Sequence, residues 1–155
     1  MTVTVVRQVP YDSPVGAALV AAALAELARR YGGDGDSTPI SPAEFTAPHG
    51  AFLVAWVGDV PVGCGGWRSF ATDTTVAEVK RMYTAPDWRG RGVAATVLRA
   101  IEASARAAGR KRLVLETGSG QPEAIAFYEK QGYERIPNFG HYRDHPGCVS
   151  FGRQL

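Results

Sequence analysis

The chain has 155 residues, of which 45% are hydrophobic and 21% are charged, and its formal net charge is +2. These values fit an ordinary globular protein with one core, and the small net charge argues against binding of nucleic acid. No apolar run approaches the roughly 18 residues of a membrane span, and the first residues lack the charged-then-apolar order of a signal peptide. We therefore expect one domain over residues 1–155, a cytoplasmic location, and neither a nucleic-acid partner nor a membrane partner.

The cysteines and histidines do not have the spacing of a metal site. Cys64 and Cys148 lie far apart in the sequence, which favours two buried thiols in a reducing compartment. His49, His141 and His145 also lack the spacing of zinc ligands. We predict that the protein binds no metal.

The first fifty residues predict a strand, a helix and a long loop. A β-rich run covers Thr2–Val9. Ser13 and Pro14 have the pattern of an N-cap followed by proline at the first helical position, and the helix stops at Gly32-Gly33. Residues 32–50 are loop-like, and they form either a flexible connector or a wall of a substrate site.

The next segment predicts three consecutive strands. Residues 51–57 and 60–70 flank the turn residues Gly58-Asp59, which is a hairpin signal. Glycines within the second of these strands indicate a bulge or a close backbone approach. After a loop over Ala71–Thr74, alternating hydrophobic and charged residues over Val76–Met82 predict a strand with two different faces.

A glycine-rich loop and a long helix follow this strand. The loop residues 89–94 (RGRGVA) precede apolar residues at helical spacing: Val93, Val97, Leu98, Ile101 and Ala105. Such a loop can direct free backbone N–H groups at one anion, assisted by the helix dipole. A tight turn without a ligand is the alternative.

The last third of the chain predicts a strand, a helix and two short strands. Arg110-Lys111-Arg112 is expected to be a solvated lead into a buried strand over Arg112–Thr117. A helix begins at Pro122 and ends at Gly132, and two short strands lie within Tyr133–Leu155. The order of elements predicts a mixed α/β (α+β) fold.

Several of these motifs, in this order, resemble the GNAT superfamily of acyl-CoA-dependent N-acyltransferases. RGRGVA at residues 89–94 fits that family's Arg/Gln-x-x-Gly-x-Gly/Ala loop, and FYEKQGY at residues 127–133 fits its Leu/Phe-Tyr-x-x-x-Gly-Phe/Tyr segment. The resemblance covers residues 51–155. It implies a central, mostly antiparallel twisted sheet of about six to seven strands, with helices on both faces.

The resemblance also implies acetyl-CoA as co-substrate. Backbone N–H groups of the glycine loop would hold the pyrophosphate, and the end of the preceding strand would pair with the pantetheine arm. Gln121 stands where the family usually has an asparagine that contacts the pantetheine. The residues expected at the coenzyme are Met82, Tyr83, Thr84, Arg89, Gly90, Arg91, Gly92, Val93, Ala94, Ala95 and Gln121.

Two residues are candidates for the chemistry. The resemblance makes Glu78 a general base, acting through water on an amine whose ammonium pKa is roughly 10. The alternative is an ion pair of Glu78 with Lys80 or Arg81. Tyr128 matches a family tyrosine whose hydroxyl faces the coenzyme sulfur as a general acid, and its alternative is a core tyrosine.

The predicted reaction is direct transfer of an acetyl group to a primary amine of a small molecule or peptide. A non-catalytic acyl-CoA-binding module is the alternative, and a nucleotide-binding module is a third hypothesis. The acceptor stays open: acids in the long loop (Asp34, Asp36 and Glu44) would attract a cation, whereas Arg81 or Arg143 would hold a carboxylate. Phe139, His141 and Tyr142 are further candidates for substrate contact, and dimers are common in the family.

Overall fold

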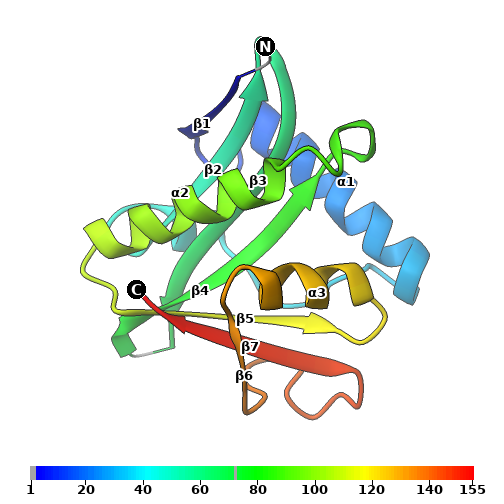
Figure 1. The fold of residues 1–155 in the computed structure, drawn as a ribbon, viewed down its shortest axis with the longest axis vertical. Helices are drawn as coiled ribbons and strands as arrows, with labels where there is room; N and C mark the ends of the chain where they lie inside the picture. Colours follow the sequence, from blue (N-terminus) through cyan, green and yellow to red (C-terminus); the bar gives the residue numbers. More distant parts are fainter. Residues whose placement is uncertain (1–2, 72) are drawn as a thin grey trace.

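One sheet of seven strands runs through the computed structural model, which describes residues 3–71 and 73–155 (Figure 1). The strand order is β1-β2-β3-β4-β5-β7-β6, and every neighbouring pair is antiparallel except the parallel pair β4 and β5. The strands are β1 (Thr4–Gln8), β2 (Gly50–Val57), β3 (Val60–Phe70), β4 (Asp73–Thr84), β5 (Arg112–Gly118), β6 (Glu134–Ile136) and β7 (Cys148–Gln154). The helices are α1 (Pro14–Tyr31), α2 (Val93–Ala107) and α3 (Pro122–Lys130), with short 3-10 turns η1 (Pro42–Phe45) and η2 (Pro86–Trp88).

Helix α1 begins and ends at the residues that the sequence indicates. The Ser13 hydroxyl accepts a hydrogen bond from the Gly16 N–H at 3.3 Å, with Pro14 as the first helical residue. Gly32 ends the helix at a φ of 84°, a left-handed conformation that glycine adopts without strain. The prediction for this helix is confirmed.

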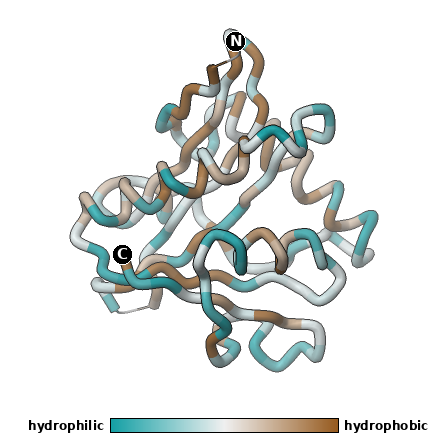
Figure 2. Tube along the Cα trace, in the orientation of Figure 1, coloured by the Kyte–Doolittle hydropathy of each residue, from teal (hydrophilic) through white to brown (hydrophobic). Residues whose placement is uncertain are grey.

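Helices cover both faces of the sheet, as predicted (Figure 1). Helix α1 packs on one face over Phe52, Val54 and Cys64, and we call this the α1 face. Helices α2 and α3 cover the opposite face, which we call the α2/α3 face, where the predicted apolar stripe of α2 is buried. In Figure 2 the hydrophobic residues follow the strands and the hydrophilic residues gather in the outer turns.

The glycines of β3 allow close packing on both faces. A Cβ atom built on Gly65 would lie 2.4 Å from the Met82 sulfur, and one on Gly66 would lie 2.8 Å from the Ala51 carbonyl oxygen. Opposite Gly65 the register of β3 and β4 shifts, because Cys64 pairs with Tyr83 while Gly66 pairs with Lys80. At Gly65 the extra residue belongs to β4, but β3 has an extra residue of its own, Val62, between the pairs Trp56–Pro61 and Ala55–Gly63. A bulge and a close approach are therefore both present in β3.

Two sequence predictions are corrected by the structure. Arg110 is not solvated: its side chain is buried over the Trp67 ring and donates a hydrogen bond to the Ser69 hydroxyl at 2.9 Å. Strand β4 begins at Asp73, within the predicted loop. Thr2 and residue 72, which belong to the predicted first strand and to that loop, lie outside the described residues.

Strands β4 and β5 diverge after a short parallel ladder. Residues Val76–Glu78 of β4 pair with residues Arg112–Val114 of β5, and both strands continue beyond these pairs. Strand β5 stays paired with β7 as far as Gly118, so the opening lies between β4 and β5, toward their carboxyl ends (Figure 1). Within the described ranges, no helix is long and apolar enough to cross a membrane.

Candidate active site

A cavity of about 380 Å³ fills the opening between the diverging strands. Its walls come from Val79–Tyr83 of β4 and Leu115–Gly118 of β5, together with α1, α3 and the loop between β6 and β7. Because α1 and α3 lie on opposite faces of the sheet, the cavity extends from one face to the other through the gap. Its volume is that of an ordinary small-molecule site.

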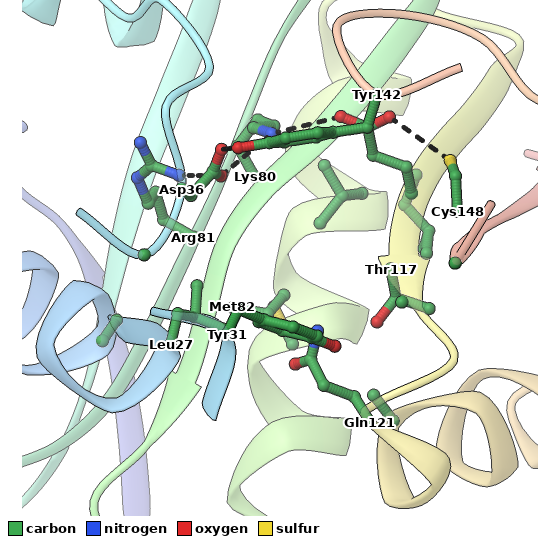
Figure 3. A pocket seen from close by; sticks show the side chains of 18 of the residues that line it. Leu27, Tyr31, Asp36, Lys80, Arg81, Met82, Thr117, Gln121, Tyr142 and Cys148 are labelled. Atoms are coloured by element: carbon green, nitrogen blue, oxygen red, sulfur yellow. Dashed lines mark hydrogen bonds and ion pairs between the residues drawn. The ribbon is translucent and has the colours of Figure 1, made fainter. Parts of the chain in front are cut away.

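A β-bulge in β4 places two consecutive cationic side chains on the α1 face. Arg81 has a φ of 61°, and together with Met82 it opposes the single residue Gly65. Lys80 and Arg81, which would alternate in a regular strand, both reach Asp36 as a result (Figure 3). The distance from the Lys80 Nζ to the Asp36 Oδ2 is 3.5 Å.

The carboxylate of Asp36 has no spare capacity for a ligand. One oxygen accepts bonds from the Thr38 N–H at 2.9 Å, the Thr38 hydroxyl at 2.6 Å and the Tyr142 hydroxyl at 2.9 Å, and the other faces Lys80 and Arg81. Burial alone would raise the pKa of Asp36, but Lys80, the Thr38 donors and Arg81 together hold this pKa well below its usual range. We call Asp36, Lys80, Arg81 and Tyr142 the Asp36 cluster.

The Asp36 cluster decides the role of the loop over residues 32–50. Gly35 and Asp36 line the cavity, and the Ser37 N–H donates to the Tyr142 hydroxyl at 2.7 Å. The loop is therefore part of the cavity wall. The bonds to Tyr142 also connect it to the segment between β6 and β7, across the opening of the sheet.

Glu116 of β5 also points into this cavity from the α1 face. Its side chain is 5% exposed, and its Oε1 lies 3.7 Å from the Lys80 Nζ, too far for a hydrogen bond. That oxygen has no hydrogen-bond partner among the described residues. Burial raises the pKa of Glu116, Lys80 opposes the shift, and the charges of Glu78 and Asp36 add to it.

Glu78 lies on the same face as Glu116 but behind the cavity wall. Its Oε1 accepts a hydrogen bond from the Arg68 Nε at 3.1 Å, and Arg68 also bonds Glu44 at 2.9 Å. Glu78 is not among the described residues that line the cavity. The predicted alternative, a structural ion pair, is thus present with Arg68 instead of Lys80 or Arg81.

Tyr128 of α3 lines the cavity from the α2/α3 face. It packs against the rings of Phe127, Tyr133 and Phe151, and Ala124 on the same helix also faces the cavity. Burial raises the pKa of Tyr128 above its ordinary value, so its hydroxyl remains protonated and can donate a hydrogen bond. Tyr128 is therefore both a core residue and a cavity residue.

The glycine loop leaves the amino end of α2 without a side-chain cap. Gly92 is the N-cap residue with a φ of 82°, and the first backbone bond of the helix runs from the Thr96 N–H to the Gly92 carbonyl. The N–H groups of Val93, Ala94 and Ala95 precede that bond, and helix geometry leaves them without intrahelical acceptors. A Cβ atom on Gly90 or Gly92 would meet no protein atom within 4 Å. The space in front of this helix end can therefore receive an anion.

The two arginines of this loop have different surroundings. Arg89 is engaged: it pairs with Glu26 of α1 at 2.7 Å and donates to the Thr84 carbonyl at 3.0 Å. Arg91 lies over the Trp88 ring at 4.8 Å, and no ion pair to it occurs within the described part of the chain. Arg91 is thus the arginine available to a phosphate group.

The remaining predicted coenzyme residues lie along the same opening. Met82 and Tyr83 line the cavity, and Thr84 ends β4 beside the glycine loop. Gln121 precedes α3 and lines the cavity, and Figure 3 shows it on the other side of the cavity from the Asp36 cluster.

Both cysteines are buried free thiols, as predicted. Burial raises the pKa of Cys64 to about 12, and its thiol donates to the Arg81 carbonyl at 3.4 Å. Cys148 lines the cavity, but burial raises its pKa too, so neither cysteine is an activated nucleophile. The described residues contain no group of three or more His, Cys, Asp or Glu side chains that could hold a metal ion.

The acceptor candidates from the sequence fall into two groups. Tyr142 lines the cavity, whereas Phe139 packs edge-on against Phe70 and His141 contacts Ser37 at 3.1 Å. Asp36 and Arg81, proposed from the sequence to attract opposite charges, bind each other instead.

Sequence reasoning missed Glu116, and it named Asp36, Arg81 and Tyr142 as separate candidates without indicating that they form one cluster. A signal for Glu116 was present, because an acid within the apolar strand RLVLET must point to the face opposite its neighbours. The Asp36 cluster gave no such signal, since its members come from three distant segments.

Comparison with known proteins agrees with this geometry. The sequence model described as "Acetyltransferase (GNAT) family" matches residues 21–133. An "IAA acetyltransferase" of Azospirillum brasilense is 38% identical over 153 residues, covering 93% of this chain and 92% of the relative. A Klebsiella pneumoniae structure described as an acyl-CoA N-acyltransferase superimposes with a TM-score of 0.80 at 27% identity, covering 98% of this chain and 97% of that one. A GNAT acetyltransferase of Elizabethkingia anophelis with acetyl-CoA bound shares the fold, with a TM-score of 0.70 at 17% identity and 98% of each chain covered.

Proposed function

Because this chain belongs to the GNAT acetyltransferase family, we propose that it transfers an acetyl group from acetyl-CoA to the primary amine of a small molecule or peptide. The observation that carries the proposal is the cavity between β4 and β5, which lies beside the uncapped amino end of α2. Named acetyltransferases among the relatives favour an enzyme over a non-catalytic acyl-CoA-binding module.

Three features fit acetyl-CoA. The N–H groups of Val93, Ala94 and Ala95, with Arg91 nearby, would hold the pyrophosphate. Beyond Glu78, the edge of β4 that faces β5 has no strand partner within the described ladders, so it can pair with the amides of the pantetheine arm. The cavity would then receive the thioester.

Tyr128 would donate a hydrogen bond to the sulfur as the carbon–sulfur bond breaks. An ordinary thiol has a pKa of about 8.5, below that of any tyrosine shifted upward by burial. Complete proton transfer from Tyr128 to the thiolate is therefore uphill, and the raised pKa favours stabilisation by a hydrogen bond. The proton that the thiolate finally gains would come from the acylated nitrogen or from solvent.

A carboxylate on the α1 face would take the proton from the attacking amine. Glu78, the residue predicted for this role, pairs with Arg68 and does not line the cavity, so it would act through an intervening water or side chain. The amine would then lose its proton on the α1 face, and the departing sulfur would be stabilised on the α2/α3 face. The attacking amine and the leaving thiolate would thus lie on opposite sides of the gap.

Calorimetric titration with acetyl-CoA, with NADH and ATP as controls, tests the coenzyme assignment. We expect selective binding of acetyl-CoA, and equal binding of ATP would contradict the assignment. Thiol release would then be screened over amines, amino acids, peptides and aminoglycosides. IAA belongs in the panel because of the Azospirillum relative, and acetylation of IAA without that of any amine would overturn the amine proposal.

A further inference from the structure

We propose that Glu116 binds the ammonium group of the acceptor and takes its proton, with Glu78 supporting it from behind the cavity wall. This inference rests on the proposed acetyl transfer and extends it by naming the residue that contacts the acceptor.

The acidic side chains that line the cavity differ in whether their oxygens already have partners. Of the described residues that line the cavity, three are acidic: Glu26, Asp36 and Glu116. Glu26 pairs with Arg89 at 2.7 Å, and both oxygens of Asp36 are occupied by the contacts described above. Glu116 alone among these three presents a buried oxygen, Oε1, that lacks a hydrogen-bond partner.

A buried carboxylate oxygen without a hydrogen-bond donor destabilises the protein, and more so when the group is charged. An ammonium group supplies three N–H donors and a compensating charge, so it fits this oxygen in both respects. Lys80, at 3.7 Å, does not fill the position because Asp36 and the Thr38 hydroxyl also attract it. The site therefore matches a primary ammonium group better than a neutral or anionic acceptor.

The position of Glu116 also suits the reaction. Leu115 and Glu116 are consecutive in β5 and point to opposite faces, so Leu115 packs with Tyr128 in the core while Glu116 faces the Asp36 cluster. A thioester carbonyl in the gap would thus have Glu116 on the amine side and Tyr128 on the sulfur side.

The proton balance is complete with these groups. The ammonium gives one proton to Glu116, and the freed nitrogen lone pair forms the carbon–nitrogen bond. The carbon–sulfur bond breaks with its electron pair going to sulfur, and the second proton lost by nitrogen neutralises the thiolate. Glu116 returns its proton to solvent when the product leaves.

The charged groups that face Glu116 set its pH dependence. On β4 these are Lys80 and Glu78, and from the loops they are Asp36 and His141. From β7, the Cys148 thiol lies 3.9 Å from the Glu116 Oε2. Burial is the largest cause that raises the pKa of Glu116, so the carboxylate form is present above this raised pKa and is lost as the pH falls through it.

The experiment compares Glu116→Gln with Glu78→Gln as matched control. We expect Glu116→Gln to lower kcat/KM for the amine about 100-fold or more and to remove the acid limb of its pH profile. Glu78→Gln should lower kcat/KM less and move the acid limb to lower pH, because the charge of Glu78 raises the pKa of Glu116. A lost limb in Glu78→Gln with an unchanged limb in Glu116→Gln would overturn the proposal.

A binding measurement keeps the test independent of the acceptor's identity. The probe is n-butylammonium chloride at about pH 7, where an alkylamine is protonated, titrated into the protein saturated with coenzyme A. We expect saturable binding, weakened about tenfold or more in Glu116→Gln but retained in Glu78→Gln. Equal binding to Glu116→Gln, or no binding to the unaltered protein, would refute the ammonium site. Failure to bind coenzyme A would instead refute the proposed function.

Discussion

At the scale of single residues, the hydroxyl groups of Tyr128 and Tyr133 have different surroundings. The Tyr133 hydroxyl donates to the buried carboxylate of Glu102 at 2.7 Å, whereas Tyr128 lines the cavity. Their rings pack with centroids 5.9 Å apart, so both belong to one core. They form a matched pair for separating chemistry from stability.

Tyr128→Phe should lower kcat about tenfold or more, because the departing sulfur loses a hydrogen bond. The dissociation constant of acetyl-CoA should change little. Tyr133→Phe should leave kcat near its original value and lower the free energy of unfolding, since Glu102 loses a buried donor. Steady-state kinetics and urea unfolding of both variants check this prediction, and an unchanged kcat in Tyr128→Phe would return Tyr128 to a purely structural role.

The sequence predicts which residues belong to the candidate site better than it predicts which contacts they make. The resemblance selected Tyr128, which does line the cavity, and it selected Glu78, which lies behind the wall with Arg68. Whether a residue of β4 lines the cavity depends on where β4 and β5 separate, and their last described pair is Glu78 with Val114. Strand register is a long-range property that alternation along one strand does not contain.

At the scale of the element, helix α2 has a glycine of the same conformation beyond each end. Gly92 and Gly109 both have a φ of 82°, and a Cβ atom on either would meet no protein atom within 4 Å. Because both glycines have the same left-handed φ, we expect a similar backbone strain for a substitution at either position, about 1–2 kcal/mol. Their electrostatic surroundings are opposite, because the amino end of a helix attracts anions and the carboxyl end does not.

Gly92→Glu should therefore abolish binding of acetyl-CoA, whereas Gly109→Glu should preserve it at a similar cost in stability. Calorimetric titration and thermal unfolding of the two variants measure binding and folding separately. If Gly92→Glu still bound acetyl-CoA, the pyrophosphate would have to lie elsewhere, and if both variants lost binding, strain alone would explain the loss.

Elements were more predictable than the site because their signals are local. The N-cap at Ser13, the turn at Gly58-Asp59 and the apolar stripe of α2 each arise from residues a few positions apart. The β-bulge at Arg81 is different, because it depends on glycine in the neighbouring strand and on Asp36 across the fold. The glycines of β3 predicted a bulge in that strand, but nothing in the sequence indicated the bulge in β4 that brings Lys80 and Arg81 to one face.

For the whole molecule, the Asp36 cluster is a bridge between the two parts of the divided sheet. Asp36 contacts Lys80 and Arg81 of β4 on one side and Tyr142, in the segment between β6 and β7, on the other. Its lowered pKa makes this bridge sensitive to acid. A carboxylate whose pKa is depressed by folding stabilises the folded state above its unfolded pKa of 3.8, and that contribution is lost as the pH falls toward its folded pKa.

Asp36→Asn should therefore be less stable than the unaltered protein near neutral pH, and the difference in free energy of unfolding should shrink as the pH falls below about 4. Urea unfolding over a pH series measures this difference. Asp34→Asn, a change at an exposed acid of the same loop, serves as control and should show no such convergence. A difference for Asp36→Asn that stays constant with pH would mean that the ion pairs do not stabilise the fold.

The sheet consists of two blocks of neighbouring strands, β1–β4 and β5–β7, and each block comes from one continuous stretch of the chain. Residues through α2 supply β1–β4, and residues from β5 onward supply the other three strands, so the backbone passes between the blocks once, at the exposed turn around Gly109. Each block carries one wall of the cavity, and neither encloses it alone. Two polypeptides divided at Gly109 would therefore be inactive apart and would recover acetyl transfer on association, which is the layout of a split reporter for protein proximity.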